Sequence, residues 1–417
     1  MPTGAQPALE GEVLPAESPR ELTLRRPGAA SPTLIRTDTG LLLPGVDDQT
    51  LSAAAKRFEA AGTPETTKAV YVYQWMRVVN WFSDGSLGPP HPRPFLPMSV
   101  RDCQDWIGAH WDMRNAAGQL AGRNGQPYAP TTVELSLAVI SLVHQAKGIA
   151  SPTRHPDVHR TMRGYRNEWV AAGFRPDIAH ALSYDEMLLM AATCDTTSVA
   201  GLRNAAMITL AFAMGARNSE VCAIKVHDLR TVSPTRILVK VAQSKTDKLG
   251  LGEDVPIEAD LDDAPELCPV ALTREWIQLL RQRGYTGAAL FPQVASTGEH
   301  RKEGGHRGTI LTAPVTRGAF HKIVVRAAAK AGIDFDPTTG DRRQIVPHSL
   351  RAGFATASSE AGMDTAAIAR HGRWAPESPV VFRYVRSGKM WAHNPATAVR
   401  RAHKAARDAG EGGERDG

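Results

Sequence analysis

Apolar side chains recur at helical spacing through residues 48–173. Between Thr66 and Phe82, valine, tyrosine and tryptophan residues stand at positions that share one face of a helix, and this pattern predicts an amphipathic helix. Similar patterns predict helices over 100–113, 131–147 and 157–171, with proline-rich or glycine-containing stretches between them. The first half of the chain is therefore predicted to form a helical domain over residues 48–173.

The helical pattern resumes after a short break. Residues 174–182 contain Pro176 and are predicted to form a linker. Ser183 and Glu186 then give the serine-x-x-glutamate pattern in which each side chain caps a free backbone N–H group at a helix start. Further helical patterns cover 197–214, 268–283 and 316–330, and shorter ones flank Gly362.

One stretch of the second half alternates instead. Residues 236–243 place β-branched and polar side chains in turn, which predicts a strand. The polar residues 244–250 predict a turn, and 254–258 predict the returning strand. The expected fold is therefore mainly α with a small β-hairpin or sheet, an α+β class.

Three polar stretches lack a core pattern. Residues 1–47 are rich in proline and glycine and are predicted to be a disordered arm. Residues 294–311 contain four glycines and several basic residues, which predicts an exposed loop. Residues 403–417 are predicted to be a polar tail, so the second domain is expected over 183–402.

Composition narrows the class of partner. The 417 residues carry a formal net charge of +6, which suits a polyanion but is weak evidence alone. No apolar run approaches the roughly 20 residues of a membrane-crossing helix, and the first residues lack a signal-peptide core. The cysteines have no metal-ligand spacing and fit reduced thiols of a cytoplasmic protein: Cys103, Cys194, Cys222 and Cys268. We therefore expect no metal site, no cofactor and no membrane partner.

Basic side chains gather on the predicted helix over 157–171. Arg160, Arg163 and Arg166 recur every three residues there. They are candidates for contact with the phosphate backbone of DNA. An ordinary solvated helix face is an equally good interpretation of the same residues.

The chemistry concentrates near the end of the chain. Tyr384 is a candidate oxygen nucleophile of the kind that holds a covalent intermediate. Arg351 offers a planar set of donors that matches phosphate oxygens. His348 precedes this arginine by three residues, so both lie on the same side of a helical first turn. Together these residues suit an attack on a phosphodiester.

Two further segments carry candidate cations. Arg217 follows a predicted helix end and precedes the next helix, with Glu220 one turn later. A plain ion pair between these two residues is the alternative interpretation. The predicted hairpin turn carries Lys245, with Lys248 three residues away, and an ordinary surface lysine is the alternative there.

These motifs resemble the tyrosine recombinase (phage integrase) family in sequence order. The resemblance rests on H-x-x-R with a downstream tyrosine and on a G-x-R-x-S-E segment. It implies a helical core-binding domain followed by a tyrosine-recombinase catalytic domain. It also implies six catalytic residues and a supporting Glu220, the six being Arg217, Lys245, His348, Arg351, Trp374 and Tyr384.

The chain departs from the common family pattern at one position. Gly372-Arg373-Trp374 stands where many members have a glycine-histidine pair, and some members have tryptophan. The interval from Trp374 to Tyr384 is one residue longer than usual. Arg373 and His371 therefore remain alternatives to Trp374, as Lys248 remains an alternative to Lys245.

The resemblance implies a site-specific recombinase or integrase of double-stranded DNA. Tyr384 would form a 3′-phosphotyrosyl bond without a metal ion or ATP, and a 5′-hydroxyl from another strand would reverse the step. Exchange between two duplexes implies a homotetramer on DNA, in the nucleoid of the cytoplasm. The alternatives are DNA relaxation of the type IB topoisomerase kind and a catalytically silent DNA-binding protein.

Overall fold

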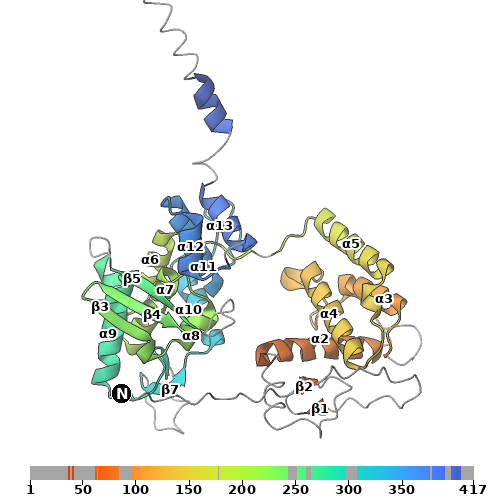
Figure 1. The fold of residues 1–417 in the computed structure, drawn as a ribbon, viewed down its shortest axis with the longest axis horizontal. Helices are drawn as coiled ribbons and strands as arrows, with labels where there is room; N and C mark the ends of the chain where they lie inside the picture. Colours follow the sequence, from red (N-terminus) through yellow and green to blue (C-terminus); the bar gives the residue numbers. More distant parts are fainter. Residues whose placement is uncertain are drawn as a thin grey trace, which may run out of the picture. The chain divides into compact units, whose positions relative to one another are not determined.

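The chain divides into two compact units, Met1–Pro176 and Asp177–Gly417, in the computed structural model drawn in Figure 1. The structure describes residues 36–37, 40–41, 62, 64–83, 96–176, 178–242, 251–259, 264–295, 308–375, 378–389 and 396–404. Each unit contains its own cluster of buried apolar side chains, so each is described by itself.

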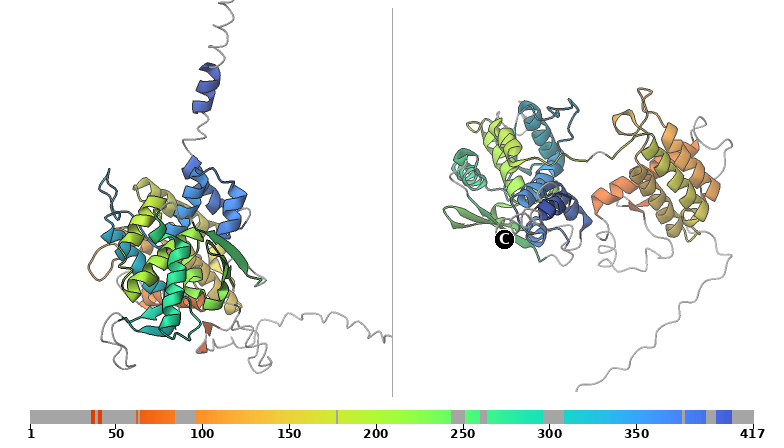
Figure 2. Two further views of the ribbon diagram at one scale, coloured as in Figure 1. Left: turned by 90° about the vertical axis from the view of Figure 1, so that its left-hand side faces the viewer. Right: turned by 90° about the horizontal axis from the view of Figure 1, so that it is seen from above.

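The described part of the N-terminal unit is a bundle of four α-helices (Figure 2). The helices are α2 (Glu65–Ser83), α3 (Val100–Asp112), α4 (Pro130–Ala146) and α5 (Pro156–Ala171). The two-residue strands β1 (Arg36–Thr37) and β2 (Gly40–Leu41) pair antiparallel, and the short 3₁₀ turns are η1 (Arg123–Gly125) and η2 (Pro152–Arg154). All four predicted helices of this half are confirmed, because each end lies within one residue of the prediction.

Tryptophan side chains fill the core of the N-terminal bundle. Trp81, Trp106 and Trp169 are buried together with Val133. The rings of Trp81 and Trp106 lie 5.2 Å apart between centroids. The indole N–H of Trp106 donates to Ser136 Oγ at 3.0 Å, which satisfies this buried donor.

The C-terminal unit is mainly helical. Its described α-helices are α6 (Tyr184–Ala192), α7 (Val199–Ala213), α8 (Asn218–Ala223), α9 (Pro269–Gln282), α10 (Arg317–Lys330), α11 (Pro347–Glu360), α12 (Thr365–Gly372) and α13 (Pro379–Lys389), and residues 396–404 are helical as well. The predicted capping box is confirmed, with Ser183 and Glu186 bonded reciprocally at the start of α6. α11 packs against α7, α12 and α13. This packing brings the end of α7, the start of α11 and the middle of α13 together.

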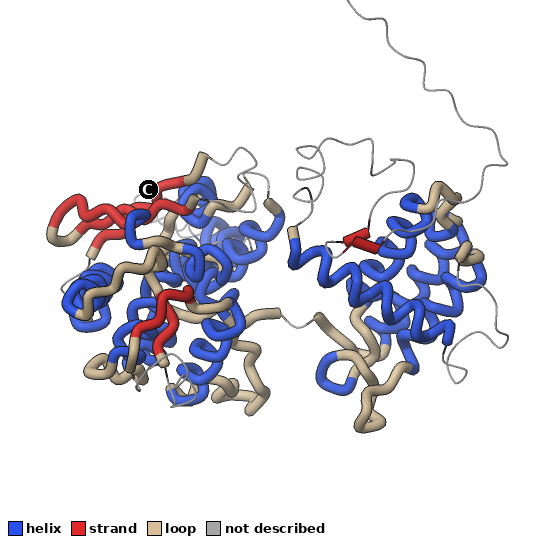
Figure 3. The backbone as a smooth tube through the Cα atoms, turned by 90° about the horizontal axis from the view of Figure 1, so that it is seen from below, coloured by secondary structure: helices blue, strands red, loops and turns tan. Residues whose placement is uncertain are grey.

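Two small antiparallel sheets accompany these helices (Figure 3). The first has the order β3 (Leu229–Ser233), β4 (Arg236–Val241), β5 (Glu253–Glu258), and the second pairs β6 (Pro292–Val294) with β7 (Ile310–Pro314). The predicted β4–β5 hairpin is confirmed, with Val239 opposite Val255. β3 was not expected, because its exposed positions leave no alternating pattern in the sequence. The pairing of β6 with β7 also corrects the expectation of a plain loop over 294–311, although residues 296–307 lie outside the described part.

The predicted linker over 174–182 contributes to both cores. Phe174 packs against the N-terminal cluster, whereas Leu182 is buried in the C-terminal one. A Cβ atom at Gly353 would lie 2.1 Å from the carbonyl oxygen of Leu182, so α11 needs glycine to pack against this segment.

The described residues are thus mostly helical with small antiparallel sheets, which confirms the predicted fold class. None of the helices in the described part combines the length and the apolar character needed to span a bilayer.

Candidate active site

The turn after α7 presents Arg217. Gly215 ends α7 at φ +52°, and backbone bonds from Gly215 to Phe212 and from Ala216 to Ala211 close the helix. A Cβ atom at Gly215 would lie 2.6 Å from the ring of Phe354, so this close approach also requires glycine. Arg217 then adopts an extended conformation at the start of α8, which confirms its predicted place between two helices.

Glu220 lies beneath Arg217 and binds two arginines. Its Oε1 accepts from Nη1 of Arg217 at 2.5 Å, and its Oε2 accepts from Nη2 of Arg373 at 2.8 Å. Burial by itself would raise the pKa of Glu220, but the charge of Arg373 and the hydrogen bonds from both arginines outweigh it, so the pKa is lowered. The carboxylate is therefore ionised, and the plain ion pair expected as an alternative is one part of a larger cluster.

α11 contributes His348 and Arg351 from its first two turns. The helix begins at Pro347, and proline suits the first helical position. Arg351 is only 1% exposed, and its Nη1 donates to the carbonyl oxygen of Gly215. Its Nη2 is buried and has no hydrogen-bond partner among the described residues. Desolvation, and then the nearby charge of Arg217, lowers the pKa of Arg351 to about 9. A bound anion would offset both the desolvation of Arg351 and the repulsion from the charge of Arg217.

Tyr384 on α13 meets His348 across the site. The Oη atom of Tyr384 lies 2.8 Å from Nε2 of His348, and the phenol ring is partly buried. Desolvation raises the pKa of Tyr384, and the charges of Arg351 and Arg383 partly oppose this. Desolvation, then the charges of Arg351 and Arg217, lowers the pKa of His348. At neutral pH the histidine is therefore uncharged, and its Nε2 can accept the phenolic proton.

Trp374 stacks on the buried arginine. The guanidinium carbon of Arg351 lies 3.8 Å from the centroid of the Trp374 ring, a cation–π arrangement. The ring centroid of Tyr384 lies 6.3 Å from that of Trp374. A Cβ atom at Gly372 would lie 1.8 Å from the Trp374 ring, which explains the glycine there. Trp374 thus joins Arg351 and Tyr384, as the resemblance implied.

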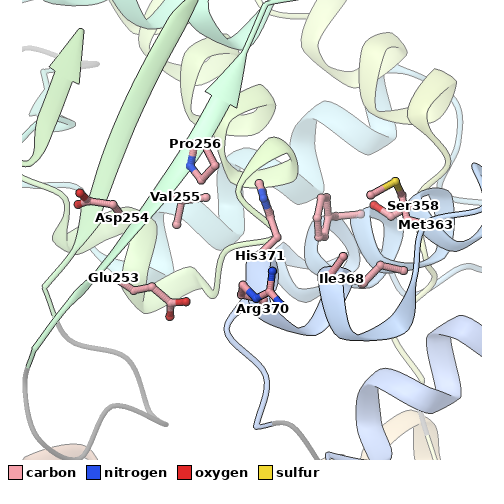
Figure 4. Close-up of a pocket in the computed structure, with 11 residues that line it drawn as sticks. Glu253, Asp254, Val255, Pro256, Ser358, Met363, Ile368, Arg370 and His371 are labelled. Carbon is pink, nitrogen blue, oxygen red and sulfur yellow. The ribbon is translucent and has the colours of Figure 1, made fainter. Parts of the chain in front are cut away.

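His371, an alternative to Trp374, faces a different part of the unit. It lines a cavity of about 400 Å³ between β5 and helices α11 and α12, where Glu253 and Arg370 are neighbours (Figure 4). Its Nε2 donates to the carbonyl oxygen of Ala213 at 2.8 Å, and its ring stacks on Phe354. Desolvation lowers the pKa of His371, so the ring is neutral at pH 7 in this arrangement.

Arg373, the other alternative, has its whole guanidinium buried. Its side chain is 0% exposed and points to Glu220 and to the carbonyl oxygens of Met214 and His371. These are partners inside the protein. Arg373 therefore packs inside the protein, in contact with Glu220 and Arg217.

Lys245 and Lys248 lie outside the described residues, within 243–250. The strands β4 and β5 that border this segment are described, and β5 also lines the cavity beside α12. The choice between the two lysines stays a prediction.

The N-terminal unit has a basic groove of its own. The groove lies between α4 and α5, has a volume of about 460 Å³ and is lined by Arg163 and Arg166 together with His159 and Arg154. Arg166 pairs with Glu134, and Arg160 pairs with Asp157 at 3.0 Å. Arg154 was not predicted, because it lies in a 3₁₀ turn where no periodic pattern marks a face.

Comparisons with known proteins identify the family of the chain. Residues 180–390 match the family model described as the phage integrase family. The chain is similar to an integrase/recombinase XerD homologue of Selenomonas ruminantium, with 26% identity over 364 residues that cover 84% of this chain and 89% of the relative. It is also similar to recombinase Cre of Escherichia phage P1, with 23% identity over 265 residues, 62% of this chain and 71% of the relative.

Solved structures show the same fold. The XerH site-specific recombinase, bound to a palindromic difH substrate in a post-cleavage complex, superposes with a TM-score of 0.52. The alignment has 14% identity and covers 84% of this chain and 85% of the other. At this identity the likeness is one of fold.

Proposed function

Because the chain belongs to the phage integrase family, we propose that it is a site-specific DNA recombinase or integrase that cuts and rejoins DNA through a 3′-phosphotyrosyl intermediate. The observation that carries the proposal is the 2.8 Å hydrogen bond between Tyr384 and His348, next to the buried Arg351. A nucleophile, a proton acceptor and an anion-binding cation lie together there, as phosphoryl transfer to tyrosine requires.

The first step is an attack by Tyr384 on a DNA phosphate. The Oη atom forms a bond to phosphorus, its proton passes to Nε2 of His348, and the bond from phosphorus to the 5′ oxygen breaks. One phosphate ester replaces another, so the bond energy is kept and ATP is not needed. A tyrosine hydroxyl ordinarily has a pKa near 10, and burial raises that of Tyr384 further. The neutral His348 is therefore needed as the proton acceptor at pH 7.

Arg217 and Arg351 stabilise the charge that develops on the non-bridging oxygens. Arg351 contributes its buried Nη2 donor, and Arg217 keeps a partly exposed guanidinium beside it. Fixed donors in a desolvated site act strongly on a transition state, because they need no reorganisation when the charge appears. The Trp374 ring holds the plane of Arg351. Donation from its indole N–H to the phosphate is part of this proposal.

The departing 5′ oxygen needs a proton, because an alkoxide is a poor leaving group. Lys245 is the proposed acid and Lys248 the alternative, in the segment of the sequence between β4 and β5. Nearby arginines would make such a lysine more acidic than its ordinary pKa near 10.4.

The proposed substrate is double-stranded DNA. The basic groove of α4 and α5 would bind the phosphate backbone, and rejoining between two duplexes requires a homotetramer on DNA. An enzyme with this substrate would work where the chromosome lies, so we propose a nucleoid-associated place in the cytoplasm.

Covalent capture tests the proposal and identifies the DNA site at the same time. The full chain is mixed with random-sequence duplexes that carry one nick, so that attack close to the nick releases a short strand and traps the intermediate. Wild-type protein should retain DNA on a denaturing gel, and Tyr384→Phe should retain none.

Captured sequences then distinguish recombination from relaxation. They are placed in two plasmids, and exchange between plasmids is measured beside loss of supercoiling. Exchange between the plasmids supports a recombinase. Relaxation alone would favour the topoisomerase-like alternative. Binding of DNA without any adduct would favour a catalytically silent DNA-binding protein.

A further inference from the structure

We propose that Arg373 positions the catalytic Arg217 by fixing the orientation of Glu220 beneath it, a role that rests on the proposed function. Its guanidinium binds one oxygen of Glu220, and its own carbonyl oxygen receives a hydrogen bond from Arg217. Arg373 would thus act on the reaction through Arg217 and would not touch the DNA.

The three side chains form a closed ring of contacts. Nη1 of Arg217 donates to Oε1 of Glu220 at 2.5 Å, and Nη2 of Arg217 donates to the carbonyl oxygen of Arg373 at 3.1 Å. Nη2 of Arg373 completes the ring at Oε2 of Glu220, 2.8 Å away. Arg217 is therefore held at two points by groups that Arg373 supplies or orients.

The backbone at Arg373 is unusual for an arginine. It adopts a left-handed conformation, φ +57° and ψ +45°, at the end of α12. Glycine usually occupies this position, and a side chain there is disfavoured. The N–H of the next residue, Trp374, bonds to Ala369 at 2.9 Å to close the helix. One turn thus aims the Arg373 carbonyl at Arg217 and places Trp374 over Arg351.

Further contacts fix Arg373 to the end of α7. Nη1 and Nη2 each lie 3.3 Å from the carbonyl oxygen of Met214, and Nη1 also donates to the carbonyl oxygen of His371 at 2.9 Å. The side chain is 0% exposed, so these bonds form in a desolvated interior. Arg373 therefore ties the end of α7 to the end of α12.

The arrangement explains how Arg217 stays available to a phosphate. A carboxylate can accept two parallel bonds from one guanidinium, and this paired geometry is favourable. Oε2 of Glu220 accepts from Nη2 of Arg373 and from the backbone N–H of Arg217, and Oε1 is left for the Arg217 side chain. Without Arg373, Glu220 would accept both bonds from Arg217 and withdraw that guanidinium from the site.

The experiment asks whether losing Arg373 removes the contribution of Arg217 alone. The rate of adduct formation in a single turnover is measured on the captured duplex in two forms. One has an ordinary phosphodiester at the scissile position, and the other a methylphosphonate, in which a methyl group replaces one charged oxygen. Charge neutralisation by Arg217 matters for the first substrate and much less for the second.

Arg373→Gly is the first variant, because glycine adopts the left-handed conformation freely and keeps the carbonyl group. We expect adduct formation to slow about 100-fold on the phosphodiester and less than about tenfold on the methylphosphonate. Arg373→Lys, which can still bind Glu220, should recover most of the loss. Arg217→Ala combined with Arg373→Gly should be no slower than Arg217→Ala alone, because both changes remove the same interaction.

The matched control is Arg203→Met. Arg203 is a buried arginine of the same unit, bonded to the carbonyl oxygen of Pro292 at 3.2 Å. Per folded molecule, this variant should form the adduct at the wild-type rate on both the phosphodiester and the methylphosphonate. If Arg373→Gly does not fold, Arg373→Met combined with Glu220→Gln removes both buried charges. Because the amide of Gln cannot accept two parallel bonds from Arg217, this variant should react faster on the phosphodiester than Arg217→Ala, and an equally slow reaction would overturn the inference.

Two outcomes separate this inference from the proposed function. If the wild-type chain forms no adduct with any duplex, the proposed function fails. If the wild type forms the adduct but Arg373→Gly slows both substrates equally, or multiplies the loss from Arg217→Ala, Arg373 has only a general structural role and the inference is overturned.

Discussion

The arginines of the C-terminal site and those of the N-terminal groove lie in opposite environments. Arg351 and Arg373 are at most 2% exposed, and their bonds run to backbone oxygens or to a buried carboxylate. In the groove, the Arg166 side chain is 51% exposed and pairs with Glu134. Arg160, on the same helix but outside the groove lining, is 77% exposed and pairs with Asp157. Exposed pairs contribute little to stability, and their partners can be exchanged for phosphates at small cost.

This contrast indicates which step each group serves. Buried arginines have fixed directions and poor solvation, so they respond strongly when negative charge develops beside them. Surface arginines bind the phosphate backbone mainly by releasing counterions, which contributes affinity without a strict geometry. We therefore expect the first group to govern the rate and the second to govern binding. Five experiments test this division.

Tyr384→Phe should give the largest effect. The phenylalanine ring can keep the contacts of the buried ring but has no oxygen to attack phosphorus. We expect no covalent adduct and nearly unchanged DNA affinity, measured by denaturing gels beside equilibrium binding. An adduct from this variant that survives denaturation would move the nucleophile to another residue.

Lys245→Ala should come next. Loss of a general acid typically slows a reaction by roughly 100- to 10,000-fold. A 5′-bridging sulfur should restore the rate, because a thiol has a pKa near 8.5 and its thiolate leaves without a proton. Lys248→Ala is the matched control and should resemble the wild type on both substrates. Rescue of Lys248→Ala instead would make that residue the acid.

Arg351→Ala should slow cleavage by about 100- to 1000-fold, because it removes a donor to the charged oxygens. DNA affinity should fall far less, and the thermal midpoint should drop because Trp374 loses the group on which it stacks. Single-turnover rates at saturating DNA separate the two effects. A parallel collapse of affinity and rate would mean that Arg351 is an ordinary phosphate anchor.

The pH dependence should report His348. Its pKa is lowered from the ordinary value of 6.5, and the neutral ring is the proton acceptor. Cleavage should therefore rise up to about tenfold per pH unit as pH increases through that lowered pKa, and be level above pH 6.5. The free energy of unfolding should change with pH in the same direction. The folded state resists protonation of His348, so the contribution of this residue to stability is present above about pH 6.5 and is lost as pH falls below it.

Arg217→Ala should move the inflection of this pH profile upward, because the Arg217 charge helps to lower the pKa of His348. His348→Asn should remove the inflection. A profile that keeps its inflection in His348→Asn would assign the titration to another group.

Arg163→Ala should have the smallest effect. Loss of one phosphate contact should weaken binding several-fold and reduce the salt slope by about 0.9, with the rate at saturating DNA unchanged. Arg101→Ala, an exposed arginine of α3 that does not line the groove, is the control. If both variants bind alike at every salt concentration, the α5 residues form an ordinary solvated face.

Local sequence determined a large part of this protein. The capping pattern at Ser183 and Glu186 and the placement of Arg217 at a helix start are confirmed, and the strand predicted over 236–243 is confirmed over Arg236–Val241. These features depend on hydrogen bonds and side-chain periods within a few residues, so the sequence alone specifies them. The ordered motifs also identified the family, which residues 180–390 confirm.

Only the tertiary structure decided how the remaining residues are used. Trp374 was the predicted residue for one catalytic position, with Arg373 and His371 as alternatives. In the structure His371 faces a cavity, Arg373 faces the Glu220 carboxylate and Trp374 faces Arg351. β3 and the pairing of β6 with β7 likewise form through partners that no local pattern marks. The physical reason is the long separation in sequence of the residues that meet. Arg217 contacts the carbonyl group of Arg373, which lies 156 positions away in the chain. A contact of that span exists only after α7, α8 and α12 have packed, because packing alone sets which donors and acceptors meet.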